Sequence, residues 1–316
     1  MRDEVIDNRG GLEMKLKEWA AFVLLGLIWG SSFLWIKIGV QEVPPVTFAA
    51  SRLFFGVAGL LVVMRLQRQA FPQDRRVLPT YLILAIFQTA LPFALIPWGE
   101  TIIDSSLASI LNGATPLFTI LIAHFWLHDE KISLPSLVGI VVGFGGVVVL
   151  MNRDLAPGAL HSNLWGQLAV LIGAASYGVG ITFSRKYMRG QPPVVQATMV
   201  VLVADILLWL VVPVTDRPVH VPLRPISWLA LVWLGVLGTC IAYLLFFYLI
   251  NAWGPTRASS VTYVFPVVGL VLGVVLLGER VDWHLFVGSL LVVAGISMVH
   301  LKRGVRAAPV AAVPAS

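Results

Sequence analysis

Long apolar runs recur along the whole chain, and polar or charged residues gather in the short stretches between them. A helix needs about 20 mostly apolar residues to cross roughly 30 Å of hydrocarbon. The pattern therefore predicts an all-α integral membrane protein with ten transmembrane helices. We expect these helices at Trp19–Ile38, Pro45–Leu66, Leu78–Trp98, Ser105–Leu127, Leu134–Met151, Leu164–Phe183, Pro193–Pro213, Ile226–Ile250, Arg257–Gly278 and Trp283–Leu301.

The polar stretches divide the chain into five parts. We expect a cytoplasmic N-terminal tail at 1–18, five helices at 19–151, an external linker at 152–163, five more helices at 164–301 and a cytoplasmic C-terminal tail at 302–316. The first run, preceded by Lys15 and Lys17, could instead be the apolar region of a secretory signal. No clear cleavage site follows it, so a retained helix is favoured. Whether translation starts at Met1 or Met14 is left open.

The two groups of five helices repeat one another. A shift of 149 positions aligns Glu130 with Glu279, and a shift of 150 aligns Thr89 with Thr239. Further matches at shifts of 148 to 150 are Gly139 with Gly288, Gly146 with Gly295, Ala108 with Ala258, Ser109 with Ser259, Pro116 with Pro266, and Pro44-Pro45-Val46 with Pro192-Pro193-Val194. Because the repeat holds an odd number of helices, the second copy must enter from the opposite face. This predicts two inverted-topology five-helix repeats, with which many secondary transporters open a midplane site to each side in turn.

Short motifs also follow one another in a specific order. They are Gly26-Leu27-Ile28-Trp29-Gly30-Ser31-Ser32-Phe33, a Pro-Pro pair before the helix that holds Arg52, Ala108-Ser109 and Pro116 leading to Leu127-His128-Asp129-Glu130, and then Ala258-Ser259, Pro266 and Gly278-Glu279-Arg280. In these motifs the chain resembles the drug/metabolite transporter superfamily, of the EamA type, over roughly 19–301. The resemblance implies ten helices in two inverted halves and export of small metabolites such as amino acids or their derivatives. It does not fix the substrate.

Composition excludes two other classes of protein. Of the 316 residues, 58% are hydrophobic and 12% charged, whereas soluble domains carry roughly 25% charged residues. An ordinary soluble enzyme is therefore excluded, and so is a disordered chain. The formal charge of +6 comes from basic residues clustered between apolar runs, which favours the positive-inside rule over nucleic-acid binding. A cytoplasmic N-terminus places sixteen basic residues inside and five outside. We therefore expect a multi-pass cell (inner) membrane protein with both termini cytoplasmic.

Two charged residues fall inside predicted spans. A charge at the centre of such a helix costs about 2.5–3.5 kcal/mol, so each is a candidate functional residue. Arg52 either reaches the outer face, pairs with Glu100 or Asp104, or binds a carboxylate or phosphate of the substrate. Its equivalent in the second repeat is Val200. Asp205 lies near the midplane, where it is either a proton carrier or a hydrogen-bonded residue between helices.

Neutral polar and aromatic residues predict the substrate pocket. Ligand pockets are mostly apolar and aromatic, with a few placed hydrogen-bonding groups. The candidates with this chemistry are Trp29, Gln88, Asn112, Tyr177, Tyr243 and Tyr263, with Thr115, Thr239 and Ser259 on the same helices. Trp98 and Tyr248 lie near helix ends, where the aromatic belt at the membrane interface is an equal alternative.

Prolines are candidates for helix kinks, and two histidines are candidates for a metal site. Pro116 and Pro266 occupy equivalent places and predict paired helix kinks beside a central cavity. His124 and His128 lie four apart on a helix and could hold a metal ion, but a solvated helix end is favoured. Cys240 is the single cysteine, so a disulfide framework is excluded. We expect no metal and no cofactor.

These observations favour one function over two alternatives. We expect a secondary active or facilitative transporter that exports a small metabolite by alternating access, driven by the substrate gradient or a proton gradient. A membrane-embedded enzyme acting on a lipid or isoprenoid would need clustered acids or histidines at one face, and a channel-like protein would not need the inverted repeat. The expected partners are a small-molecule substrate and the lipid bilayer, without nucleic acid, in a monomer or homodimer.

Overall fold

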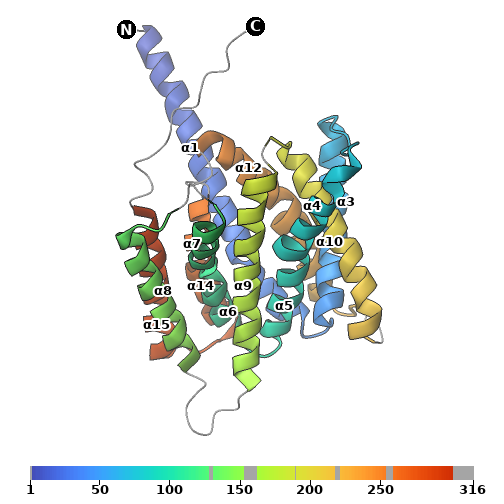
Figure 1. Ribbon diagram of the computed structural model, residues 1–316, viewed down its shortest axis with the longest axis vertical. Coiled ribbons are helices and arrows are strands. Elements are labelled where there is room, and N and C mark those ends of the chain that lie inside the picture. The colour runs from blue at the N-terminus through green and yellow to red at the C-terminus, as the bar shows by residue number, and fades with distance from the viewer. Residues whose placement is uncertain are drawn as a thin grey trace.

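The computed structural model describes residues 2–127, 131–152, 162–188, 190–217, 221–253 and 259–301, and every regular element within these ranges is helical (Figure 1). Eight helical stretches in these ranges are long and apolar enough to cross a membrane, from Leu16–Gly39 to Pro225–Phe246. Two shorter apolar helices, Val261–Leu277 and Trp283–Val299, occupy the places of the last two predicted spans. The all-helical membrane fold is confirmed. Most of the linker and the C-terminal tail, together with Glu130 and His128, lie outside the described residues.

The first half consists of α1 (Arg2–Gly30), α2 (Ser32–Gly39), α3 (Pro45–Leu66), η1 (Arg75–Val77), α4 (Leu78–Ala85), η2 (Ile86–Ala90), α5 (Leu91–Glu100), α6 (Ser105–Gly113), α7 (Thr115–Trp126) and α8 (Leu134–Asn152). The second half consists of α9 (Ser162–Tyr187), α10 (Pro193–Thr215), α11 (Pro225–Val232), η3 (Trp233–Ile241), α12 (Ala242–Trp253), η4 (Ser259–Tyr263), α14 (Val264–Leu277) and α15 (Trp283–Leu301). Helix α1 therefore includes residues that the sequence analysis assigned to an N-terminal tail.

Equivalent helices of the two halves pack against each other in opposite directions. A Cβ added to Gly139 of α8 would lie 2.6 Å from the carbonyl oxygen of Gly295 of α15, and one added to Gly146 would lie 2.7 Å from that of Gly288. The repeat aligns Gly139 with Gly288 and Gly146 with Gly295, so the contacts cross between equivalent positions. Crossed contacts of this kind require antiparallel helices related by a two-fold axis, and the inverted topology follows.

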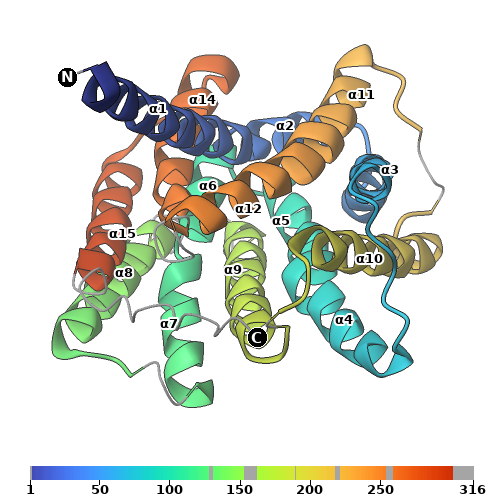
Figure 2. The same cartoon turned by 90° about the horizontal axis from the view of Figure 1, so that it is seen from above.

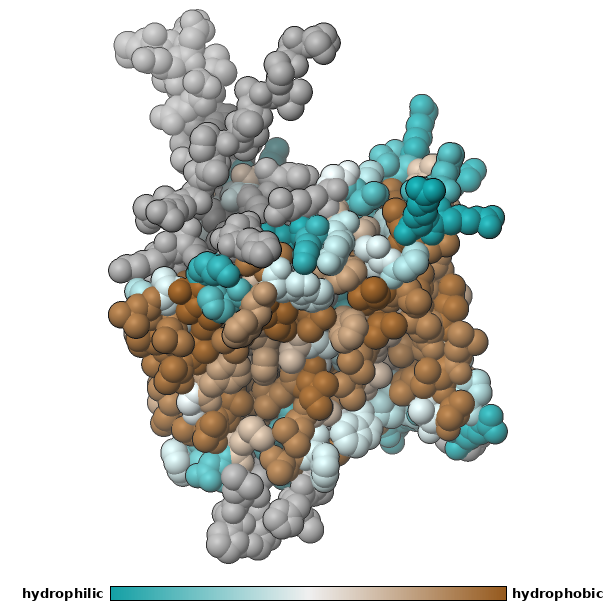
Figure 3. Space-filling model, in the orientation of Figure 1, coloured by the Kyte–Doolittle hydropathy of each residue, from teal (hydrophilic) through white to brown (hydrophobic). Residues whose placement is uncertain are grey.

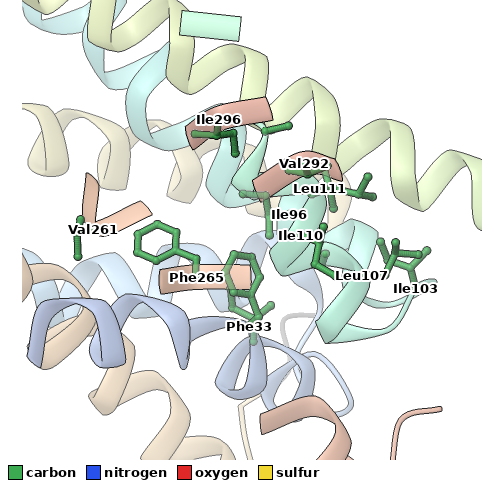
Figure 4. Close-up of a cluster of buried hydrophobic side chains, with 14 of the residues drawn as sticks. Phe33, Ile96, Ile103, Leu107, Ile110, Leu111, Val261, Phe265, Val292 and Ile296 are labelled. Carbon is green, nitrogen blue, oxygen red and sulfur yellow. The ribbon is translucent and has the colours of Figure 1, made fainter. Parts of the chain in front are cut away.

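The other helices also contact the opposite half, and the contacts made by one half are repeated by the equivalent helices of the other. Helix α3 packs on α10, while α1 packs on α12 and α14 as α9 packs on α5 and α7. Viewed from above, α3 and α10 lie on one side of the bundle and α8 and α15 on the other (Figure 2). Side chains from both halves form a common apolar core, in which Phe33, Ile96, Ile110, Phe265 and Ile296 take part (Figure 4).

The outer surface of the bundle matches a lipid environment. A broad apolar band crosses the face of the molecule seen in Figure 3 and is bordered above and below by hydrophilic residues. Large apolar side chains remain exposed within it, such as those of Val141, Leu210 and Leu276. Soluble monomers rarely expose apolar surface of this extent, so the band is the surface that contacts lipid tails.

The third span of each half contains a π-helical segment at an equivalent place, η2 in the first half and η3 in the second. In the first half the cause is Pro92, which has no N–H and would clash with the carbonyl of Gln88 in a regular α-helix. The wider turn instead lets the Leu91 N–H reach the Ile86 carbonyl. In the second half no proline follows, and the Thr239 hydroxyl donates to the Leu234 carbonyl at 3.0 Å within the segment.

Candidate substrate site

Arg52 lies in the interior of the bundle on α3. Its side chain is 6% exposed, and its guanidinium carbon lies 4.2 Å from the centre of the Phe93 ring of α5. Among the described residues it forms no ion pair with Glu100, and its Nε has no hydrogen-bond partner. A guanidinium stacked on an aromatic face is held in place by cation–π attraction. Arg52 therefore keeps donor capacity free inside the protein.

Aromatic residues from both halves surround this guanidinium. Tyr177 of α9 and Tyr243 of α12 lie near Arg52 and pack against the cluster of buried side chains that contains Phe93. Tyr243 meets Trp29 of α1 edge to face, with ring centroids 6.4 Å apart. The Trp29 indole N–H donates to the Gly238 carbonyl in η3 at 3.1 Å, which fixes its orientation. Three predicted pocket residues are thus brought together around Arg52.

The π-helical segment η2 adds polar groups beside the same cluster. The Ser176 hydroxyl on α9 donates to the Phe87 carbonyl at 2.7 Å, and a Cβ on Gly180 of α9 would lie 2.7 Å from the Gln88 Cβ. The Gln88 Oε1 is buried without a partner among the described atoms. We define the central site as Trp29, Arg52, Gln88, Phe93, Tyr177 and Tyr243. Because π segments frequently occur at functional sites, η2 marks this position independently of Arg52.

Glu100 lies at the end of α5, fully buried at 0% exposure. Neither of its carboxylate oxygens has a hydrogen-bond partner within the described chain. The Lys37 ammonium group donates instead to the backbone carbonyls of Glu100 and Ile103, at 2.7 Å each. Among the alternatives for Arg52, the direct pair with Glu100 is therefore wrong. Lys37 caps the carboxyl end of α5 and leaves the Glu100 side chain free.

Three carboxylates join the two halves at one end of the bundle, which we call the capped face; it comprises residues 40–44, 101–104, 216–217, 221–224 and 278–282. Glu279 accepts from the backbone N–H groups of Ser105 and Ser106 at 2.8 and 2.9 Å, and thereby caps α6. Glu42 accepts from the N–H of Leu223 at 2.7 Å, before α11. Asp216 accepts from the Thr47 N–H at 2.7 Å in α3. Each bond joins a carboxylate of one half to a helix start of the other.

The environments of two of these carboxylates favour their charged form. Burial opposes ionisation of Glu279, but the hydrogen bonds from Ser105 and Ser106 outweigh it and lower its pKa below the ordinary value. The hydrogen bond from the Ser227 side chain, with those from the backbone of Leu223 and Arg224, lowers the pKa of Glu42 as well. The capped face is therefore held by ionised carboxylates at neutral pH, which helix N-termini stabilise.

Two other predicted pocket residues lie around a second feature, the breaks in the fourth spans. Asn112 is buried at the end of α6, and the Tyr263 hydroxyl donates to the Ile296 carbonyl of α15 at 3.3 Å. Pro116 is in the first turn of α7 and Pro266 in the first turn of α14. A Cβ on Gly113 would lie 2.8 Å from the Pro266 ring, so the two breaks adjoin.

Asp205 lies in different surroundings from Arg52. It is 7% exposed on α10, and its side chain bonds that of Trp209, one turn further along the same helix. Its Oδ1 has no partner among the described atoms. The one hydrogen bond that Asp205 forms therefore stays within α10.

The remaining candidates lie at helix ends. The His124 Nδ1 accepts from the Ile132 N–H at 3.1 Å, so this ring stabilises the loop that follows α7. No group of three potential metal ligands occurs within the described ranges. Trp98 and Tyr248 are exposed at 41% and 43%, as side chains of an interfacial aromatic belt are.

Several site residues were not predicted from the sequence. Phe93 belongs to the site only because α3 packs on α5, and Gly238 only because Trp29 reaches across to η3. Glu100 was considered as a partner of Arg52 but not as a group of the site itself. The aligned pair Thr89 and Thr239 was the one sequence signal that marked both π-helical segments.

The chain matches a known protein family in sequence and a solved structure in fold. The model of the family described as "EamA-like transporter family" matches residues 17–152 and 164–301. A solved crystal structure that is 20% identical in sequence has a TM-score of 0.66, covering 92% of this chain and 99% of the other, which shows a shared fold.

Curated relatives cover nearly the whole chain. "Uncharacterized transporter YoaV" of Bacillus subtilis is 24% identical over 90% of this chain and 96% of its own length. "Uncharacterized inner membrane transporter YedA" of Escherichia coli (strain K12) is 29% identical over 83% of this chain and 85% of its own length. "Probable amino-acid metabolite efflux pump" of the same strain is 25% identical, covering 90% and 94%.

Proposed function

The chain belongs to the EamA-like transporter family, and from this premise we propose that it exports a small, amino-acid-related metabolite across the cell membrane by alternating access. The family and the names of the relatives support transport, and the name of one relative supports the metabolite class. The excess of basic residues on one side supports cytoplasmic termini, so the capped face is external.

One observation carries the proposal: a buried Arg52 with a free donor, surrounded by aromatic residues of both halves, at the junction of two antiparallel repeats. Trp29, Arg52 and Phe93 come from the first half, and Tyr177 and Tyr243 come from the second. A site shared by both halves changes its access whenever one half rocks against the other. A buried charge without a partner costs free energy, which a bound ligand of opposite charge would recover.

The contacts between the halves suggest how access alternates. In the conformation described here, Glu42, Asp216 and Glu279 close the external side by joining helix starts across the two halves. Opening that side requires these bonds to break while the crossed glycine contacts of α8 and α15 act as a pivot. The π-helical segments η2 and η3 lie beside the site, where their wider turns can absorb changes in helix direction.

No nucleotide-binding motif is present in the sequence, so we assign the energy source to a substrate or ion gradient. An enzyme acting on a membrane lipid would need a catalytic group at the central site. The groups found there are a guanidinium, aromatic rings, an amide and hydroxyls, which suit binding better than bond cleavage.

Counterflow in proteoliposomes tests the proposal. Purified protein is reconstituted with an unlabelled candidate inside and a trace of the same labelled compound outside, across amino acids, nucleosides, sugars and organic cations. We expect transient accumulation of the label for amino acids or close derivatives, abolished without protein. Accumulation with another class only would contradict the substrate assignment, and no accumulation with any compound would contradict transport.

A further inference from the structure

Glu100 is a fully buried carboxyl at the end of α5 that meets the capped face. Its side chain is 0% exposed, and neither of its oxygens has a hydrogen-bond partner in the part of the chain that the structure describes. An ionised carboxylate is very costly in such surroundings, whereas the protonated acid is neutral and costs far less. In the conformation with a closed capped face, Glu100 therefore holds a proton.

The capped face covers Glu100 and is continuous with it along the chain. The next residue, Thr101, is exposed, and the loop 101–104 leads to Ser105, whose N–H donates to Glu279 at 2.8 Å. Breaking that bond frees the loop that begins directly after Glu100, so opening of the capped face brings water to its side chain. A glutamic acid in contact with water is ionised at neutral pH, because its ordinary pKa is about 4.3.

Lys37 provides a cation for the ionised form of Glu100. Its ammonium group donates to the backbone carbonyls of Glu100 and Ile103 at 2.7 Å each. These bonds use two of the three N–H groups of a lysine, and no hydrogen bond joins the ammonium group to the Glu100 carboxyl in this conformation. Because Lys37 already binds the main chain of Glu100, a local movement on opening is enough to form the ion pair.

Two further charged groups lie near Glu100, and each is engaged elsewhere. Arg52 lies over the Phe93 ring, and Glu279 binds the start of α6. Helix α6 and the segment η2, which also pack on α5, carry no ionisable residue. The titratable residues on the other helices packed on α5 are Lys37 on α2, Arg52 and Arg65 on α3, and Tyr177, Arg185, Lys186 and Tyr187 on α9.

We propose that Glu100 is a proton-binding site of the external gate, which takes up one proton from external water as the capped face closes and releases it as that face opens. Uptake forms one O–H bond on the carboxylate, and release leaves a carboxylate paired with Lys37. The inference rests on the proposed function and adds a proton to its external step. Because the closed form holds one more proton than the open form, each unit of rising pH lowers the ratio of closed to open molecules by up to about tenfold.

Labelling of a thiol that the capped face buries measures how often this face opens. Val43 of the capped face is 1% exposed, so Val43→Cys in a Cys240→Ala background provides such a thiol. Leu223→Cys in the same background lies at a position that is 89% exposed when the face is closed, and it reports the pH dependence of thiol chemistry alone. We expect the maleimide labelling rate at 43, divided by that at 223, to rise about tenfold or more between pH 6 and pH 8 in detergent.

Three variants assign this rise to a residue. Glu100→Gln is uncharged at every pH, so the labelling ratio should stay constant and lie below that of the parent protein at pH 8. Glu100→Asp keeps a titratable carboxyl at this place, and Asp205→Asn removes a buried acid from α10; both should keep the rise.

A labelling ratio that is independent of pH in the parent protein overturns the inference without any further variant. So does a Glu100→Gln protein that keeps the full rise, and so does an Asp205→Asn protein that loses it. Labelling needs no substrate, so these results leave transport standing. Absence of counterflow with every compound would contradict transport instead, and would leave the labelling result to decide the proton site.

Discussion

Helices α3 and α10 occupy equivalent places in the two repeats and pack against each other, yet each carries a buried charge where the other has valine. Arg52 of α3 aligns with Val200, and Asp205 of α10 aligns with Val57. Arg52 lies among aromatic residues of both halves, whereas Asp205 bonds Trp209 on its own helix; each keeps one buried polar atom without a partner among the described residues. A buried charge in a membrane helix is therefore not a sufficient mark of a transport site. The residues that surround the charge decide whether it belongs to such a site.

The comparison also explains how a symmetric scaffold binds an asymmetric ligand. The glycine contacts, the π-helical segments and the breaks before Pro116 and Pro266 occur in both halves. Arg52, Phe93 and Glu100 come from the first half alone. Duplication thus supplies the frame that rocks, and single substitutions within it supply the chemistry of the site.

Replacing Arg52 of α3 by valine, the residue at the equivalent place in α10, should have the largest effect on transport. Arg52→Val removes the cation that we assign to a ligand group of opposite charge and creates no buried unpaired charge on α3. We expect counterflow to fall at least about tenfold, because a charged hydrogen bond contributes about 1.5–3 kcal/mol. Thermal unfolding in detergent should show no loss of stability. A variant that transports at the wild-type rate would contradict the role of Arg52.

The capped face, where α10 ends beside the start of α3, should give an intermediate effect that depends on pH. The pKa of Glu279 is lowered in the folded protein, so its stabilisation is complete above the ordinary value of about 4.5 and is lost as pH falls through the folded value. Glu279→Gln should lower the free energy of unfolding by about 1 kcal/mol at pH 7, as loss of a helix cap does.

Melting temperatures of both proteins from pH 7 to pH 3 check this prediction. The difference between wild type and Glu279→Gln should shrink as pH falls below about 4.5, because the unfolded chain takes up the proton there first, and it should vanish once pH is below the lowered pKa of the folded carboxylate. A difference that stays constant over the whole range would show that the charge of Glu279 does not hold the capped face.

Neutralising the charge of α10 should have the smallest effect. Asp205→Asn keeps the size of the side chain and its ability to bond Trp209, so we expect counterflow within about twofold of wild type and an unchanged pH profile. Rates measured between pH 6 and pH 8 provide the test. A lost or displaced pH dependence would restore Asp205 as a proton carrier.

The sequence predicted the spans and the repeat because both depend on local composition and on matched positions. Arg52, Trp29, Gln88, Tyr177 and Tyr243 could be nominated for the same reason, as polar or aromatic residues within apolar runs. What brings these five together is the packing of α3 and α9 on α5 and of α1 on α12.

Two further features needed the three-dimensional structure. Glu279 aligned with Glu130 in the repeat, but its partner Ser105 lies 174 residues away and on another helix. Glu100 read as a polar helix end, and its burial arises from the close approach of α2, α6 and α9. Such contacts join residues that no local pattern relates.

The most direct test of alternating access is a reversible link across the capped face. Glu42→Cys and Arg224→Cys, in a Cys240→Ala background, place thiols on opposite halves at a contact between the Glu42 carboxylate and the Arg224 N–H of 3.1 Å. A short, reducible bifunctional thiol reagent should abolish counterflow, and reduction should restore it, while Glu42→Cys alone remains active after the same treatment. A linked protein that transports at the full rate would show that the capped face does not open during transport.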